Sequence, residues 1–209
     1  MHNRYNFIAG QSVERLAAIS DGVFAVAMTL LVLDLHMPAA ETIHSEAGLW
    51  QAVVALAPRV LVYLMSFLTL GIFWVGQQTQ LNQLERSDRD FTWVHLAFLF
   101  AVSLTPFSTS LMAEFISYRI ALIIYWANIL LLGVILYAAW AFARRARLLK
   151  PNVTEDVDEA VKRRIIGAQM LYAFGAALCV ISTTWALGFI LLVQLNYALA
   201  PRLRFLQRL

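Results

Sequence analysis

The chain has 209 residues, of which 61% are hydrophobic and 14% are charged, and its formal net charge is +3. Ordinary soluble domains are about 45–50% apolar and about 25% charged, so this composition excludes a soluble protein and predicts an all-α integral membrane protein. Membrane topology accounts for the basic residues, as described below, so no nucleic-acid partner is expected.

The first predicted helix covers about residues 14–37 and carries polar residues near its start. A bilayer core of about 30 Å needs about 20 mostly apolar residues, which this segment supplies. The polar residues are Arg15, Ser20 and Asp21. A carboxylate inside an apolar segment is costly, so Asp21 should face protein or water and have partners. The N-terminal stretch lacks the pattern of a cleaved signal peptide, so we expect this helix to remain in the mature protein.

A helical wheel places Val26, Leu30 and Leu33 on one stripe of this first helix, with Thr29 at the edge of the stripe. Asp21 lies roughly opposite Leu30 on the helix. The stripe and the carboxylate can therefore both face one narrow central axis only if the helix bends. Such a stripe is also typical of lipid-facing or core positions. Periodicity alone does not choose between these interpretations.

Five further apolar segments follow the first helix and complete a single domain over residues 1–209. They cover about residues 50–80, 91–112, 118–143, 165–183 and 185–200. Six crossings place both termini on one side of the membrane, together with 14 of the 16 Lys and Arg residues. The positive-inside rule makes that side cytoplasmic. Between the fourth and fifth segments, Thr154 and the acids after it are typical of an N-cap and the first turn of a helix.

The start of the first segment lies beside the end of the second, because the two run in opposite directions. Trp74, Gln77 and Gln78 stand at that depth and can donate hydrogen bonds to Asp21, and Arg15 can supply a compensating charge. The simpler interpretation is a polar cluster that locks helices together. A direct proton or ion relay is the alternative.

Three other residues are expected to have structural roles. Arg59, in the outer half of the second segment, needs a partner, and Asp34 at the outer end of the first segment is the best placed in sequence. His95 is expected to be an interfacial packing residue, and Cys179, the only cysteine, a packed thiol. The chain has no metal-ligand spacing, phosphate-binding glycine loop or paired nucleophile and base, so an enzyme is not expected.

Two motifs resemble those of a known family. Arg15-x-x-x-Ile19-Ser20-Asp21 resembles the R-x-x-x-F-S-D motif of the transmembrane protein 175 family of potassium channels, with Ile19 at the usual Phe position. The run FWVGQQ at residues 73–78 resembles the family's F-W-x-x-H-H run, with glutamines at the usual histidine positions. The run LTPFSTSLMAEF is also similar to the family's third helix and outer turn.

The resemblance implies a homotetramer, as in prokaryotic members, in which four copies of the first helix line a potassium pore that lacks a T-V-G-Y-G filter. Rings of Val or Leu can close such a pore by dewetting. By position, the resemblance implies a constriction at Val26, Leu30 and Leu33, a potassium preference at Thr29, and a supporting network of Arg15, Ser20, Asp21, Trp74 and Gln77.

We therefore expect a potassium-preferring, leak-like cation channel in the inner membrane of a prokaryote. Its expected partners are lipid, monovalent cations and further copies of the chain. No cofactor is expected, and the only metal is permeating K⁺ near Thr29. Three alternatives stay open: a proton-permeable channel of the same architecture, a small secondary transporter or exporter with saturable coupled flux, and a membrane scaffold without flux.

Overall fold

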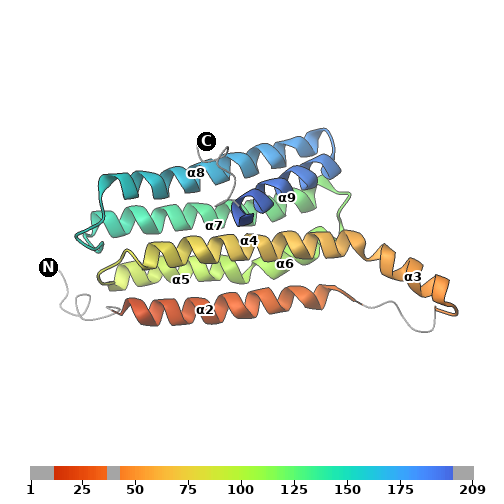
Figure 1. Cartoon of the computed structure of the whole chain (residues 1–209), viewed down its shortest axis with the longest axis horizontal. Helices are drawn as coiled ribbons and strands as arrows, with labels where there is room; N and C mark the ends of the chain where they lie inside the picture. The colour runs from red at the N-terminus through yellow and green to blue at the C-terminus, as the bar shows by residue number, and fades with distance from the viewer. Residues whose placement is uncertain (1–11, 37–42, 200–209) are drawn as a thin grey trace.

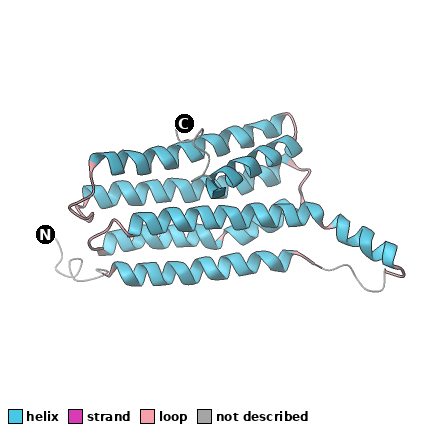
Figure 2. Ribbon diagram, in the orientation of Figure 1, coloured by secondary structure: helices cyan, strands magenta, loops and turns pink. Residues whose placement is uncertain are grey.

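Helices account for nearly all of the described chain, which comprises residues 12–36 and 43–199 of a computed structural model (Figures 1 and 2). Within these residues, extended structure is limited to an isolated bridge between Leu84 and Leu149. The all-α class is confirmed. The helices are α2 (Val13–Leu30), η1 (Leu31–Asp34), α3 (Glu46–Ala55), α4 (Ala57–Leu81), α5 (Arg89–Ser103), α6 (Thr105–Glu114), α7 (Arg119–Arg145), α8 (Glu155–Ala177), η3 (Leu178–Val180) and α9 (Thr183–Leu199).

The long helices lie side by side with roughly parallel axes, α2 at one edge of the bundle and α8 at the other (Figure 1). Helix α2 contacts α4, α5 and α6, whereas α7 packs between α5 and α8. Both chain termini, and the predicted helix ends at residues 37 and 200, lie outside the described residues. At the edge of the bundle, one face of α2 makes no contact with the other described helices, which matters for the site below.

Four described segments are long and apolar enough to cross a membrane: Val13–Asp34, Ala57–Leu81, Arg89–Glu114 and Arg119–Arg145. They correspond to the first four predicted segments. Helix α9 is apolar but has only 17 residues, and α8 begins with a charged first turn, so neither reaches the same length of apolar helix. The two remaining crossings stay a prediction.

Prolines divide two of the predicted segments, which corrects their description as single helices. The segment predicted over residues 50–80 is split at Leu56, where α3 ends and α4 begins. Pro58 in the first turn of α4 has no N–H, and its ring clashes with the carbonyl of a preceding helical turn. Pro106 divides the segment predicted over residues 91–112 into α5 and α6 in the same way. Helix α3 consequently projects beyond the bundle (Figure 1).

Helix α8 begins ten residues before the predicted position 165, because the acidic run after Thr154 is its first turn. Thr154 is the N-cap residue, as predicted, although its side chain makes no capping hydrogen bond. Asp158, 6% exposed, forms ion pairs with Arg144 of α7 and Lys162 of α8, and accepts a 2.8 Å hydrogen bond from Trp140 Nε1. These contacts fix the end of α7 against the start of α8.

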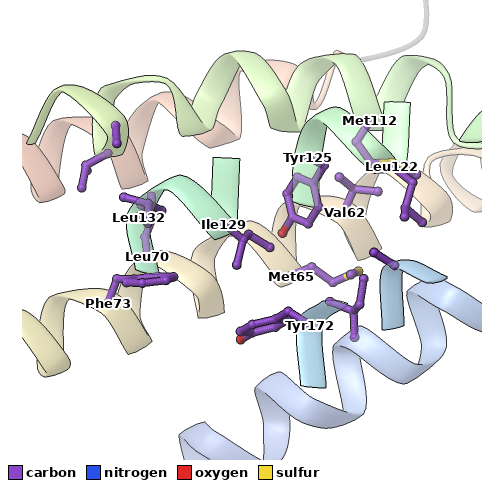
Figure 3. Packing of buried hydrophobic residues seen from close by; sticks show 14 of the residues in the cluster. Val62, Met65, Leu70, Phe73, Met112, Leu122, Tyr125, Ile129, Leu132 and Tyr172 are labelled. Atoms are coloured by element: carbon purple, nitrogen blue, oxygen red, sulfur yellow. The ribbon is translucent and has the colours of Figure 1, made fainter. Parts of the chain in front are cut away.

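The core contains polar side chains that bond to each other across helices. Figure 3 shows Tyr125 and Ile129 of α7 among apolar residues of α4 such as Met65. Gln194 of α9 donates to Thr69 Oγ1 of α4 over 2.7 Å, and Thr69 in turn lies 3.3 Å from the Tyr125 hydroxyl. Because lipid cannot satisfy polar groups, such internal bonds hold α9 to the bundle.

Arg59 pairs with Glu114 and not with Asp34, so the predicted partner is wrong. The guanidinium of Arg59, near the start of α4, lies 2.6 Å from Glu114 Oε2 at the end of α6. Both side chains are partly exposed, at 32% and 56%. Asp34 ends the 3₁₀ turn after α2, and no described residue forms an ion pair with it.

A double-mutant cycle tests this pair. Arg59→Gln and Glu114→Gln should each lower the free energy of unfolding by about 0.2–1 kcal/mol, the usual range for an exposed ion pair. The double variant should lose no more than either single one, and Asp34→Asn should change nothing. Thermal unfolding of the purified protein in detergent measures all four. Additive losses from the two single variants would contradict the pairing.

Candidate functional site

Helix α2 has two distinct faces along its length. Its buried residues recur every three or four positions and form one stripe against the bundle: Leu16, Ser20, Phe24 and Ala27, followed by Leu31 in η1. The predicted stripe lies elsewhere on the helix. Val26, Leu30 and Leu33 are 58%, 43% and 65% exposed, so the single chain leaves them uncovered.

A shallow groove runs beside the uncovered residues of α2, between this helix and the end of α5. The groove has a volume of about 460 Å³ and is lined almost entirely by apolar residues. They are Ile19, Gly22, Val23, Val26, Ala27 and Leu30, with Ser103 from the end of α5. A groove of this kind on a helix at the edge of a bundle is a surface that a second helix can pack against or that can face a shared axis.

The change from α-helix to 3₁₀-helix after Leu30 aligns two residues of the predicted stripe. In a 3₁₀-helix, side chains three residues apart eclipse each other. Because η1 spans Leu31–Asp34, Leu33 comes close to standing directly over Leu30. The Thr29 hydroxyl is exposed, and it donates within its own helix to Ala25 O or Val26 O, both at 2.9 Å. The lone pairs of its oxygen therefore stay available on the outer side.

Behind α2, three side chains from three helices form a buried polar cluster. Ser20 of α2 is 0% exposed, Gln77 of α4 is 2% exposed and His95 of α5 is 3% exposed. Ser20 Oγ lies 2.8 Å from His95 Nε2 and 2.9 Å from Gln77 Nε2. The cluster ties α2 to α4 and α5 at one depth.

Hydrogen counting assigns the donors in this cluster. Ser20 Oγ donates its one proton to Leu16 O at 2.7 Å, so it can only accept from its other neighbours. Gln77 Nε2 donates to Ser20, and His95 then donates from Nε2, which leaves His95 Nδ1 unprotonated in the neutral ring. The longer 3.4 Å contact between Gln77 Nε2 and His95 Nε2 brings two N–H groups together and is not a hydrogen bond in this arrangement.

Asp21 makes the contacts of a second, more exposed cluster. Trp74 Nε1 and Gln78 Nε2 both donate to Asp21 Oδ1 at 2.8 Å. The prediction that Trp74 and Gln78 lie beside Asp21 is confirmed. The prediction that Gln77 also contacts Asp21 is wrong, because Gln77 Nε2 donates to the preceding residue, Ser20. Adjacent residues of α2 thus serve two clusters, one buried and one at the rim.

Arg15 does not supply the compensating charge that was expected of it. Its side chain is exposed, and no described residue forms an ion pair with it. Its backbone N–H donates to Ser12 Oγ, the N-cap of α2. Within the described chain, Asp21 is therefore held by neutral donors alone.

The structure contradicts the predicted position of His95. It was expected to be an interfacial packing residue, but it is buried between Ser20 and Gln77. A helical wheel of α5 contains the missing signal, since His95 shares one stripe with the buried residues Phe91, Phe98, Leu99 and Val102. A polar residue on a fully apolar stripe needs a buried partner.

We expect His95→Leu to lower the free energy of unfolding by about 1–3 kcal/mol. Leucine has a volume similar to that of histidine but cannot donate the buried hydrogen bond to Ser20. The matched control is Trp93→Leu on the same helix, whose side chain is 62% exposed. Its effect should stay within about 0.5 kcal/mol. Thermal unfolding in detergent measures both variants. Equal losses of stability would show that the buried hydrogen bond of His95 does not stabilise the fold.

Comparison with known proteins decides the family. Residues 15–106 match the family model described as endosomal/lysosomal potassium channel TMEM175. A protein of Streptomyces collinus named as a potassium channel is 30% identical over 188 residues, covering 88% of this chain and 90% of the relative. The chain belongs to the TMEM175 family. A protein of Chamaesiphon minutus, also named as a potassium channel, is likewise 30% identical, over 88% of this chain and 93% of the relative.

The fold of this TMEM175-family chain also matches a solved structure. The crystal structure of a lysosomal potassium-selective channel TMEM175 homolog from Chamaesiphon minutus superposes with a TM-score of 0.79 at 27% identity. The match covers 91% of this chain and 98% of that one. The human relative, named as an endosomal/lysosomal proton channel, is 26% identical over 90% of this chain but only 36% of its own length. The TMEM175 family is one of ion channels, so the chain is a membrane protein of a channel family.

Proposed function

We propose that the protein is a potassium-preferring, leak-like cation channel, assembled as a homotetramer around four copies of α2. The observation that carries the proposal is the uncovered apolar face of α2 with Val26, Leu30 and Leu33, at the edge of a bundle that buries the opposite face of the same helix. Fourfold assembly gives this face an axis to surround. The two bacterial relatives named as potassium channels support the cation.

In this assembly Val26, Leu30 and Leu33 form stacked rings that close the pore by dewetting. The 3₁₀ turn strengthens the idea, because Leu33 above Leu30 makes two rings at the same azimuth. Thr29 contributes hydroxyl oxygens between the rings. Their lone pairs compensate a cation for part of its lost hydration, while the hydroxyl protons stay bonded within α2.

The proposed location is the inner membrane of a prokaryote, with six crossings and both termini in the cytoplasm. The N-terminal end of α2, the end of α4 and the α7–α8 connection lie at the same end of the bundle (Figure 1). The described basic residues there include Arg15, Arg89, Arg144 and Lys162, whereas Arg59 and Arg119 stand at the opposite end. By the positive-inside rule, this bias supports a cytoplasmic location for the end that is richer in basic residues.

A proton-permeable channel of the same architecture is the second candidate, since the vertebrate relatives are named proton channels. Reconstitution in liposomes separates the two. Purified protein should dissipate a potassium gradient, and the reversal potential should follow the potassium gradient and not a pH gradient. A reversal potential that follows pH makes the second candidate correct. Saturable, coupled flux indicates a transporter, and absent flux a scaffold.

Thr29→Val tests the selectivity role. The valine keeps the shape of the side chain but removes the oxygen, so the preference for K⁺ over Na⁺ should fall by on the order of tenfold, the factor that corresponds to about 1.4 kcal/mol. Thr79→Val is a matched control, because Thr79 is also exposed and also donates within its own helix, to Val75 O. Reversal potentials in mixed K⁺ and Na⁺ gradients provide the measurement. Unchanged ratios in Thr29→Val contradict the role.

A further inference from the structure

A cavity of about 90 Å³ lies between α4, α7, α8 and α9, on the side of the bundle away from α2. Most of its wall is apolar: Phe73 and Gly76 of α4, Leu136 of α7, and Ile165 and Ala168 of α8. By the measure of about 10–15 Å³ for one water molecule, this volume admits several waters or a short stretch of acyl chain. The apolar wall favours the chain.

Two polar atoms at this cavity have no partner among the described residues. The Tyr172 hydroxyl belongs to a side chain that is only 1% exposed, and it makes no hydrogen bond. Gln169 Oε1 is likewise unpaired, although Gln169 Nε2 donates to Ile129 O at 3.4 Å. In a membrane protein an unsatisfied polar group costs several kcal/mol in general. The cavity therefore suits an occupant with hydrogen-bonding groups as well as an apolar part.

The charged residue at the cavity rim is Arg164, the last of three consecutive basic residues on α8. Lys162 and Arg163 each pair with an acid one turn earlier, Asp158 and Glu159. Arg164 has alanine at the corresponding position, and within the described residues it has no acidic partner. Its guanidinium instead stacks over the Tyr197 ring, 5.8 Å from the centroid. One cation in the run is left for a ligand.

We propose that this cavity binds an anionic phospholipid, with the phosphodiester on Arg164 and the first part of an acyl chain in the cavity. The apolar sequence that follows Arg164 places this residue where α8 enters the bilayer. Basic pockets between membrane helices on the cytoplasmic side bind anionic headgroups. Tyr172 lies eight residues further along α8, about 12 Å deeper, so its hydroxyl can donate to an ester oxygen below the headgroup.

Three variants test the proposed lipid-binding site. Arg164→Gln removes the headgroup contact at an exposed position. Gly76→Leu fills the cavity from α4, where an added Cβ meets only Leu136, at an ordinary 3.7 Å. Arg163→Gln is the matched control, since it removes the same charge one residue earlier from a guanidinium that already pairs with Glu159. Thermal unfolding in detergent shows which variants remain folded.

Native mass spectrometry of the purified full chain, mixed with dioleoyl phosphatidylglycerol or dioleoyl phosphatidylcholine, gives the readout. The wild-type protein should retain the anionic lipid on the order of fivefold better, the factor expected for one basic residue near an anionic headgroup. Arg164→Gln and Gly76→Leu should lose that preference, and Arg163→Gln should keep it. If Gly76→Leu does not fold, Arg164→Gln alone decides.

Equal retention of both lipids by the wild-type protein overturns the proposal. Equal loss in Arg163→Gln and Arg164→Gln shows a general surface effect and also overturns it, as does full retention by a folded Gly76→Leu variant. A parallel arm with oleate identifies a free fatty acid as the ligand if oleate is retained and phosphatidylglycerol is not, which is again a contradiction. Binding is measured without ion flux, so its failure leaves the proposed channel function standing.

Discussion

Replacing Leu30 and Leu33 together with alanine is expected to raise potassium flux through the reconstituted protein by tenfold or more. In the proposed tetramer each substitution shortens the four side chains of one apolar ring, so water should enter the proposed constriction more readily. A barrier lowered by about 1.4 kcal/mol already gives a tenfold rate. The selectivity for K⁺ over Na⁺ should weaken at the same time, because a wetter pore leaves ions more hydrated. Flux assays in liposomes with a potassium gradient measure both effects.

Two leucines elsewhere are close controls for this variant. Leu131 on α7 is 39% exposed, against 43% for Leu30, and Leu192 on α9 is 65% exposed, as is Leu33. Replacing Leu131 and Leu192 by alanine removes the same atoms from other helices. We expect the potassium flux through this Leu131 and Leu192 variant to equal that through the wild-type protein. Unchanged flux in the Leu30 and Leu33 variant would take both residues out of the constriction.

Asp21→Ala is expected to abolish the proposed tetramer, or nearly so. The substitution strands the Trp74 and Gln78 donors that now converge on Asp21 Oδ1. Hydrogen bonds to a charged group contribute about 1.5–3 kcal/mol each, and a tetramer loses them four times. Because Asp21 is exposed in the single chain, at the edge where neighbouring subunits would meet, the loss falls on assembly. Size-exclusion chromatography with light scattering measures the oligomeric mass.

Asp21→Asn is the control, because an amide oxygen can still accept both hydrogen bonds. We expect this variant to keep most of its tetramer, which separates the loss of an acceptor from the loss of a charge. A stable Asp21→Ala tetramer with altered permeation alone would show that Asp21 acts on ions directly.

Periodicity and depth were sufficient to predict much of this architecture. Apolar length identified the four long spans, and the antiparallel course of neighbouring helices placed Trp74 and Gln78 beside Asp21. The breaks before Pro58 and Pro106 were readable in the sequence, since proline cannot continue a helical hydrogen-bond pattern, but apolar composition concealed them. Composition reports burial in lipid and is insensitive to helix continuity.

Partner choice at the helix ends was beyond sequence reasoning. Arg59 had several acids within reach at its end of the bundle, and its choice of Glu114 depends on where the break at Pro106 directs α6. The expected Arg15 to Asp21 pairing failed for a similar reason. The two residues lie six positions apart on one helix, where side chains do not face each other.

The two clusters on α2 restrict how the proposed channel could open. Ser20 and Asp21 are consecutive residues, about 100° apart around the helix. Ser20 bonds to Gln77 of α4 and His95 of α5, and Asp21 bonds to Trp74 and Gln78 of α4. Because both residues are hydrogen-bonded to neighbouring helices, α2 cannot rotate about its own axis without breaking these bonds together. Opening by rotation of α2 about its own axis would therefore break several hydrogen bonds. Tilting a whole subunit outward, or filling the proposed constriction with water, would leave the bonds of Ser20 and Asp21 in place.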